Sequence, residues 1–127
     1  MENNLFGHVE SISKYVPTAE LRIKVILLDI GVPTHLAGYL CLQQAIKLYR
    51  DNPYQQITKE LYIDVAAACR NRQTSTQVEK MIRTAIEATW KMGEKEKLRL
   101  YFPQNVDRRP SNGEFISRVA SLVDIIK

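Results

Sequence analysis

The sequence predicts an all-α fold, a compact bundle of about six helices that contains a helix-turn-helix, with an extra helix at the N-terminus. Apolar residues recur at three- and four-residue spacing along most of the chain, and no stretch alternates apolar and polar residues as a half-buried strand does. Capping boxes begin at Thr74 and Ser111. Glycine or proline follows several of the periodic segments, as at Gly31 and Pro103, which defines where those helices end.

Glycine and proline separate the helices expected in the first half of the chain. Residues 4–16 carry apolar side chains at i, i+4, i+7 and i+11, and Pro17 ends this helix. Thr18 is placed to cap a second helix, which stops at Gly31 because glycine adopts the left-handed conformation readily. A third helix is expected over 34–50, before an Asp-Asn-Pro sequence that breaks it.

Helix-capping and helix-ending residues also separate the helices expected in the second half of the chain. Thr58 is placed to cap one helix, and the capping box at 74–77 starts a long helix that Gly93 ends. A second capping box at 111–114 opens the last helix, after a loop. The expected helices are residues 59–69, 75–92, 94–102 and 114–127.

Composition narrows the class of protein. The 127 residues are 45% hydrophobic and 25% charged, which is typical of one globular domain with its own core. The longest strongly apolar run, 25–28, is far shorter than the roughly 20 residues needed to cross a bilayer. No secretory signal is recognisable, so the expected location is the cytoplasm, at the nucleoid. Cys41 and Cys69 lack CxxC or zinc spacing and are expected to be two buried thiols.

Positive charge is concentrated in one part of the chain. Residues 70–99 contain eight basic and four acidic residues, and this excess equals the net charge of +4 of the whole chain. With a sequence pI near 9.1, such a segment suits a polyanion whose phosphates exchange counterions for Lys and Arg. A solvated helix face has a similar charge, so this observation alone leaves both interpretations open.

The helices expected at 59–69 and 75–92, joined by a short polar turn, have the layout of a helix-turn-helix. In that motif the second helix enters the major groove, so its outward face needs long polar side chains. Gln77, Lys80, Arg83 and Thr84 occupy that face. Lys donates to guanine O6 and N7, Gln pairs with adenine, and Arg or a helix N-terminus holds phosphate.

Four blocks of sequence resemble a known family. The segment IGVPTHLAGYL at 30–40 closely resembles the opening of the C-terminal effector domain of the stage-zero sporulation response regulator, a transcription factor of spore-forming bacteria. Blocks at 57–64, 78–93 and 110–120 agree in the same order. The resemblance implies a six-helix domain that binds double-stranded DNA, often as head-to-tail copies on promoter boxes resembling TGTCGAA. It also implies a homodimer on DNA and the sigma subunit of RNA polymerase as a partner.

The resemblance assigns roles by position. It places Gln77, Glu79 and Lys80 at the bases, and Arg83 and Thr84 at bases or phosphate. Thr58 and Lys59 match the start of the anchoring helix, where phosphate is contacted. The full set of expected DNA-binding residues is Thr58, Lys59, Arg72, Thr76, Gln77, Glu79, Lys80, Arg83, Thr84 and Lys91.

The chain departs from the family pattern at several of these positions. The family usually has Arg where this chain has Gln77 and Lys80, and His at the position of Thr84. Losing a guanidinium fork weakens guanine reading, so an altered box or lower specificity is expected. The turn between the two helices is about two residues longer and contains Arg70 and Arg72, and the loop at 103–110 is shorter.

The resemblance begins near residue 20, which divides the chain into an N-terminal extension at 1–19 and the effector domain at 20–127. In the family a phospho-accepting receiver precedes this domain, and no receiver fits within 19 residues. We therefore expect control by protein level, by partners or by the extra helix. That helix either packs on the domain's own core or forms a dimer contact.

Other function classes have little support in the sequence. No nucleotide-binding or hydrolase motif and no isolated pair of carboxylates is present, so no enzymatic activity, cofactor or metal is expected. His35 is expected to make a structural hydrogen bond, His8 to lie alone at the surface, and Trp90 to pack in the core. The alternative function is a protein-interaction module that modulates a related regulator or RNA polymerase, using the helix at 114–127, with weak DNA binding.

Overall fold

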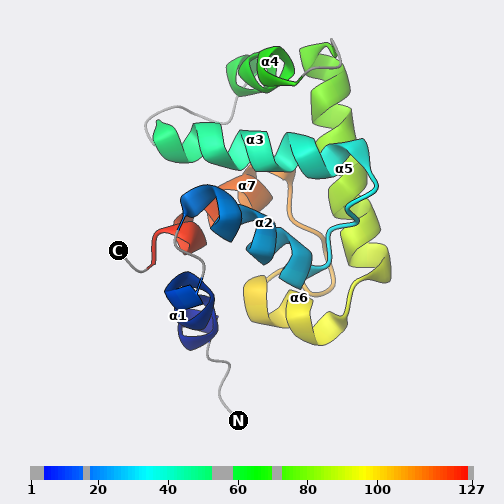
Figure 1. The fold of residues 1–127 in the computed structure, drawn as a ribbon. Helices are drawn as coiled ribbons and strands as arrows, with labels where there is room; N and C mark the ends of the chain where they lie inside the picture. The colour runs from blue at the N-terminus through cyan, green and yellow to red at the C-terminus, as the bar shows by residue number, and fades with distance from the viewer. Residues whose placement is uncertain (1–4, 16–17, 53–58, 70–72, 126–127) are drawn as a thin grey trace.

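The computed structural model describes residues 5–15, 18–52, 59–69 and 73–125. This part of the chain is all-helical, as the sequence predicts (Figure 1). No helix in it is both long and apolar enough to cross a membrane. The helices are α1 Leu5–Tyr15, α2 Ala19–Ile30, α3 Ala37–Asp51, α4 Lys59–Ala68, α5 Ser75–Met92, α6 Lys95–Tyr101 and α7 Asn112–Val123.

Several predicted helix ends are confirmed. Thr18 Oγ1 accepts a hydrogen bond from the Leu21 amide at 3.2 Å, and Gly31 has a φ of 106° at the end of α2. Both capping boxes form, at the start of α5 and of α7. Thr58, which was predicted to cap α4, lies outside the described residues.

Three predicted helix boundaries are wrong. The third helix starts at Ala37, three residues after the predicted start at 34, because residues 34 and 35 form a turn after Pro33 and Leu36 is extended. The last helix starts at Asn112, since its cap is Ser111, and it ends at Val123, where the backbone of Asp124 leaves the helical conformation. Periodicity does not fix where a helix frays.

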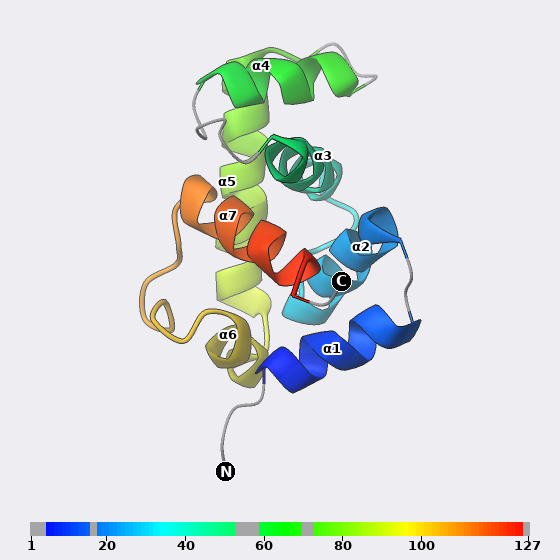
Figure 2. The same ribbon diagram turned by 90° about the vertical axis from the view of Figure 1, so that its left-hand side faces the viewer.

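The core lies where α3, α5 and α7 meet, and α2 and α4 cover its sides (Figures 1 and 2). Its largest fully buried side chains come from every helix except α1. They are Tyr101, Phe115, Ile26, Leu27, Ile30, Leu42, Ile46, Leu61, Ile82, Ile86, Ile116 and Leu122. The nonpolar surface removed from water here supplies the main driving force for folding.

The crossing of α3 and α5 depends on Gly38. A Cβ atom at this position would overlap the Met81 carbonyl oxygen and the Ala85 Cβ atom, so only glycine lets the two helices approach this closely. Met81 and Ala85 therefore face α3. This contact fixes the rotation of α5 about its axis, so the neighbouring positions Lys80 and Thr84, about 100° round the helix from Met81 and Ala85, are exposed to solvent.

Helix α1 packs against α2 and α7 of its own chain, which is the first of the two arrangements considered from the sequence. Leu5 and Val9 are buried in this contact. The prediction that His8 lies alone is wrong, because its Nε2 atom lies 2.6 Å from Asp29 Oδ2 on α2. No local sequence pattern indicates this pair, since its partners are 21 positions apart.

Candidate nucleic-acid interface

Helix α5 has one buried face and one exposed face. Val78, Ile82, Ala85, Ile86 and Thr89 are buried. Thr89 is the one polar residue among them, and its hydroxyl donates to the Ala85 carbonyl at 2.7 Å, so no polar atom of that side chain lacks a donor or acceptor partner. The exposed side carries Thr76, Gln77, Glu79, Lys80, Arg83, Thr84, Glu87 and Lys91.

The structure places α4 across the N-terminal end of α5, as in a helix-turn-helix (Figure 1). Leu61, Tyr62 and Val65 of α4 are buried, whereas Lys59 at its start is exposed. Arg72, predicted to contact DNA from the turn, lies outside the described residues together with Thr58. The structure therefore brings eight of the ten predicted DNA-binding residues to α5 and the start of α4.

Gln77, one of the residues predicted to contact bases, uses its side-chain oxygen in the capping box of α5. Gln77 Oε1 accepts from the Thr74 amide at 2.9 Å, and the Gln77 amide donates to Thr74 Oγ1 at 3.1 Å. The Gln77 side chain is exposed, and its NH₂ group makes no hydrogen bond to another described residue, so this group keeps its two donors for a ligand. This arrangement does not provide the oxygen that bidentate recognition of adenine requires.

The basic residues on α5 differ in their pairing. Arg83 Nη1 lies 3.8 Å from Glu79 Oε1, and both side chains are about half exposed, at 49% and 50%. Lys80 and Lys91 make no ion pair with any other described residue. These two ammonium groups are free to bind an anionic ligand without first breaking a contact within the protein.

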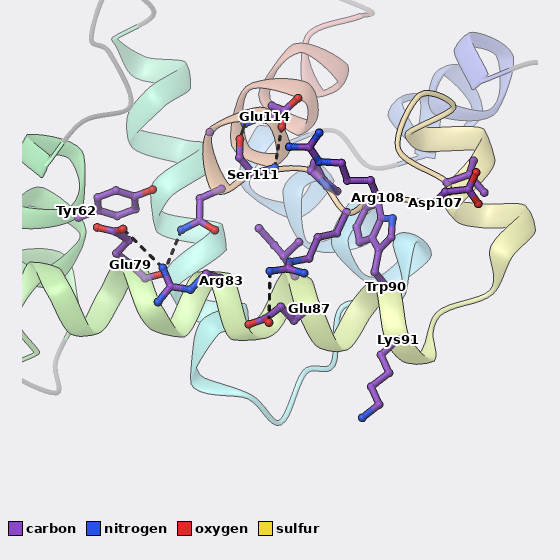
Figure 3. A pocket seen from close by; sticks show the side chains of 16 residues that line it. Tyr62, Glu79, Arg83, Glu87, Trp90, Lys91, Asp107, Arg108, Ser111 and Glu114 are labelled. Atoms are coloured by element: carbon purple, nitrogen blue, oxygen red, sulfur yellow. Dashed lines mark hydrogen bonds and ion pairs between the residues drawn. The ribbon is translucent and has the colours of Figure 1, made fainter.

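A polar groove of about 970 Å³ runs beside α5, between this helix and the segment that leads into α7 (Figure 3). Glu79, Arg83, Glu87 and Lys91 line one side, and residues 106–114 line the other. Two contacts join the walls: Arg109 Nη2 lies 3.5 Å from Glu87 Oε2, and Asn112 Nδ2 donates to the Glu79 carbonyl at 3.1 Å.

Trp90 fixes the far wall of this groove to α5. Its indole Nε1 donates to the Asn105 carbonyl at 2.8 Å, and its ring makes edge contacts with Phe102 and Phe115 at centroid distances of 5.1 and 6.1 Å. The predicted core role of Trp90 is confirmed. Two arginines of this wall, Arg108 and Arg109, are not among the residues predicted to bind DNA, although their adjacent positive charges are visible in the sequence.

The remaining residues considered as functional candidates have structural surroundings. His35 is exposed and makes no hydrogen bond to another described residue, so the predicted structural bond is absent there. Cys41 is buried and Cys69 only partly so. Burial, together with the neighbouring Cys69 thiol, raises the pKa of Cys41 to about 12, so this thiol stays protonated at neutral pH. Within the described ranges no three potential ligand side chains are grouped around a metal position.

A family model matches most of the chain. The family model described as the sporulation initiation factor Spo0A C terminal covers residues 23–123, which is most of the chain. The chain belongs to this family. The Spo0A C-terminal domain is a helical, DNA-binding effector domain of a sporulation transcription factor, and this confirms the resemblance read from the four sequence blocks. The match extends over α3 to α7 and most of α2, and it leaves out α1.

Proposed function

We propose that this Spo0A C-terminal domain is a sequence-specific transcription regulator that reads the major groove with α5. The observation that carries the proposal is the exposed face of α5, where Lys80 and Lys91 have no ion-pair partner within the described residues. Helix α4 lies across the start of α5 as the anchoring helix of the motif. A helix with this face has what a groove reader needs: donors for base edges and charge for phosphates.

Each side chain then has a role set by its place along α5. Lys80 and the free NH₂ group of Gln77 lie within the first two turns and contact base edges, with Thr76 and Glu79 beside them. Arg83, Thr84 and Lys91 lie further along and hold the backbone, as Lys59 does from α4. Thr58 and Arg72, at the start of α4 and in the turn, complete the set of phosphate contacts.

The partner expected for this site is a double-stranded promoter box resembling TGTCGAA, bound by a homodimer of head-to-tail copies. Lys80 replaces a guanidinium with an ammonium, so discrimination for guanine is expected to be weaker than a bidentate Arg contact gives. Contact with the sigma subunit of RNA polymerase follows from the same family relationship.

The alternative, a protein-interaction module acting through the last helix, has less support. Six apolar residues of α7 are buried in the domain's own core, so this helix has few apolar side chains left for a partner. They are Phe115, Ile116, Val119, Ala120, Leu122 and Val123. An interaction surface normally presents an apolar centre, which is missing on this helix.

Fluorescence anisotropy tests the proposal. The protein is titrated against a duplex with two TGTCGAA-like boxes and against a scrambled duplex, each over a salt series. We expect selective binding to the boxes and loss of that selectivity in a Lys80→Ala, Arg83→Ala variant. The lost base contact of Lys80 costs about 1 to 3 kcal/mol, and the lost phosphate contact of Arg83 weakens binding to both duplexes alike. Absence of binding at low salt would overturn the proposal.

Charge reversal separates the two functions. Lys80→Glu with Arg83→Glu should abolish regulation by a DNA reader and leave the activity of a protein that titrates a partner intact. Both side chains are exposed, so the variant is expected to fold, and circular dichroism checks this. Persistence of promoter regulation in the reversed variant would favour the interaction module.

A further inference from the structure

The groove beside α5 contains two arginines to which the proposed function assigns no base contact. Arg108 and Arg109 are exposed and lie on the segment between α6 and α7. Arg109 pairs with Glu87 of α5, whereas Arg108 lies on the side of the groove where Glu114 stands (Figure 3). Trp90 and Asn112 hold this segment against α5 through hydrogen bonds of 2.8 and 3.1 Å. The segment that carries the two arginines is therefore held at a defined position along the edge of α5.

The charges in the groove are not all equally available. Four acidic and four basic side chains line it, but three of the acids already have partners. Glu114 accepts from the Ser111 amide at 2.8 Å in the capping box, Glu79 faces Arg83, and Glu87 faces Arg109. Arg108 and Lys91 make no ion pair within salt-bridge distance of a described residue. The hydrogen bonds from Ser111 lower the pKa of Glu114, and the positive charge of Arg108 nearby adds to this effect.

Arg109 keeps donors for a second acceptor. Its ion pair with Glu87 joins one terminal nitrogen to one carboxylate oxygen at 3.5 Å, and both side chains are about half exposed, at 47% and 48%. An exposed pair of this kind contributes only about 0 to 1 kcal/mol. A guanidinium has five N–H donors, so Arg109 can bind a phosphate while Glu87 still orients it.

We propose that Arg108 and Arg109 form a second contact with the DNA backbone, at the phosphates of one strand along the edge of the major groove that α5 occupies. The inference rests on the proposed function. The major groove is only about 12 Å wide, so a helix lying in it has phosphates along both of its edges. The segment at 106–112 lies along one edge of the exposed face of α5, whereas α3, through Gly38, lies along the other side.

This contact is independent of sequence, because phosphates are the same at every base pair. It adds affinity and fixes the register of α5 without changing which box is preferred. Glu87 has two opposing effects in this site: it orients Arg109 and it repels the phosphate. Because the exposed ion pair contributes only about 0 to 1 kcal/mol, the repulsion is the larger effect, and removing the charge of Glu87 is expected to tighten binding to any duplex.

The test compares an Arg108→Ala, Arg109→Ala variant with the wild-type chain on the box duplex and the scrambled duplex. We expect about tenfold weaker binding to both, and a salt dependence whose slope falls by about two, at roughly 0.9 per phosphate contact. The matched control, Lys24→Ala with Lys47→Ala, removes two exposed charges from α2 and α3, outside the groove, and should change the slope much less. Arg108→Lys with Arg109→Lys should keep most of the slope.

Each outcome decides the inference. If the wild-type chain binds DNA and the Arg108→Ala, Arg109→Ala variant shows the same affinity and the same salt slope, the second contact alone is overturned. A loss confined to the box duplex would overturn it too, because it would assign these arginines to base reading. Failure of the wild-type chain to bind either duplex would instead overturn the proposed function, and this inference with it. Tighter binding of Glu87→Gln to both duplexes would support it.

Discussion

Two charged regions of this domain are built in opposite ways. At Asp29 on α2, one carboxylate accepts from three side chains: His8 Nε2 at 2.6 Å, Lys97 Nζ at 2.7 Å and the Tyr101 hydroxyl at 2.5 Å. On the outward face of α5, Lys80 and Lys91 make no ion pair within the described structure. The first arrangement joins α1, α2 and α6, and the second leaves charge available for a ligand.

The two regions also differ in solvent exposure, and this difference determines how much each contributes to stability. The Asp29 side chain is 22% exposed, and Tyr101 is fully buried. Burial alone would raise the pKa of Asp29, but the hydrogen bonds from Lys97, Tyr101 and His8 outweigh it and hold this pKa below its ordinary value. A charge paired in this way stabilises the fold, whereas an exposed and unpaired one contributes little to stability.

The largest effect is expected from Asp29→Ala. The substitution leaves the buried Tyr101 hydroxyl without its acceptor and Lys97 without its partner, so the free energy of unfolding should fall by about 2 kcal/mol. Urea denaturation measures this change. The folded variant should bind DNA with wild-type affinity, since Asp29 does not lie on α5.

Lys80→Ala should have the opposite effect to Asp29→Ala: it should weaken DNA binding and leave stability almost unchanged. Its side chain is exposed and unpaired, so its free energy of unfolding should stay within about 0.5 kcal/mol of wild type while DNA affinity falls. Loss of DNA binding in folded Asp29→Ala, or clear destabilisation in Lys80→Ala, would show that the two regions do not divide stability and binding between them.

Acid should remove the stabilisation by Asp29. Because the folded-state pKa lies below the unfolded one, the carboxylate stabilises the fold above the unfolded pKa, near 4, and this contribution is lost as the pH falls through the lower, folded-state value. The difference in unfolding free energy between wild type and Asp29→Asn should therefore be constant near neutral pH and shrink below about pH 4. A difference that persists at pH 2 would contradict this assignment.

How far the sequence predicts this molecule follows from the range of each interaction. The capping boxes at Thr74 and Ser111 and the end of α2 at Gly31 depend on residues within one helical turn, and the sequence predicted all three. The outward face of α5 follows from its periodicity. By contrast, the partners of Asp29, which are His8, Lys97 and Tyr101, lie 21, 68 and 72 positions away from it in the sequence. No local pattern indicates contacts over such separations.

The candidate site shows the same limit. Lys80 and Arg83 could be predicted because one helix carries them on one side. Arg108 and Arg109 could not, because their position beside α5 depends on Trp90 and Asn112 holding the connecting segment in place. The sequence also did not reveal that the oxygen of Gln77 is committed to the cap.

Gln77 belongs to both kinds of region, since its oxygen caps α5 and its NH₂ group keeps its donors for a ligand. Gln77→Glu keeps a capping box, as Glu114 does at the start of α7, and should leave stability unchanged while weakening binding to the box duplex about tenfold. Gln77→Ala should weaken binding and also lower stability by about 0.5 to 1 kcal/mol. Wild-type affinity of Gln77→Glu, measured by anisotropy, would assign this residue to the cap alone.

The smallest effect is expected at the rim of the Asp29 cluster. His8 is 36% exposed, and Lys97 and Tyr101 still hold Asp29 when the ring is removed. His8→Ala should lower the free energy of unfolding by about 0.5 kcal/mol or less, as for other exposed pairs. Val9→Ala, one position along, removes two methyl groups from a fully buried site and should lower it more, which hydrogen exchange in α1 would register as faster opening. If His8→Ala opened α1 as much as Val9→Ala does, the docking of this helix would depend on the ion pair with Asp29 rather than on apolar burial.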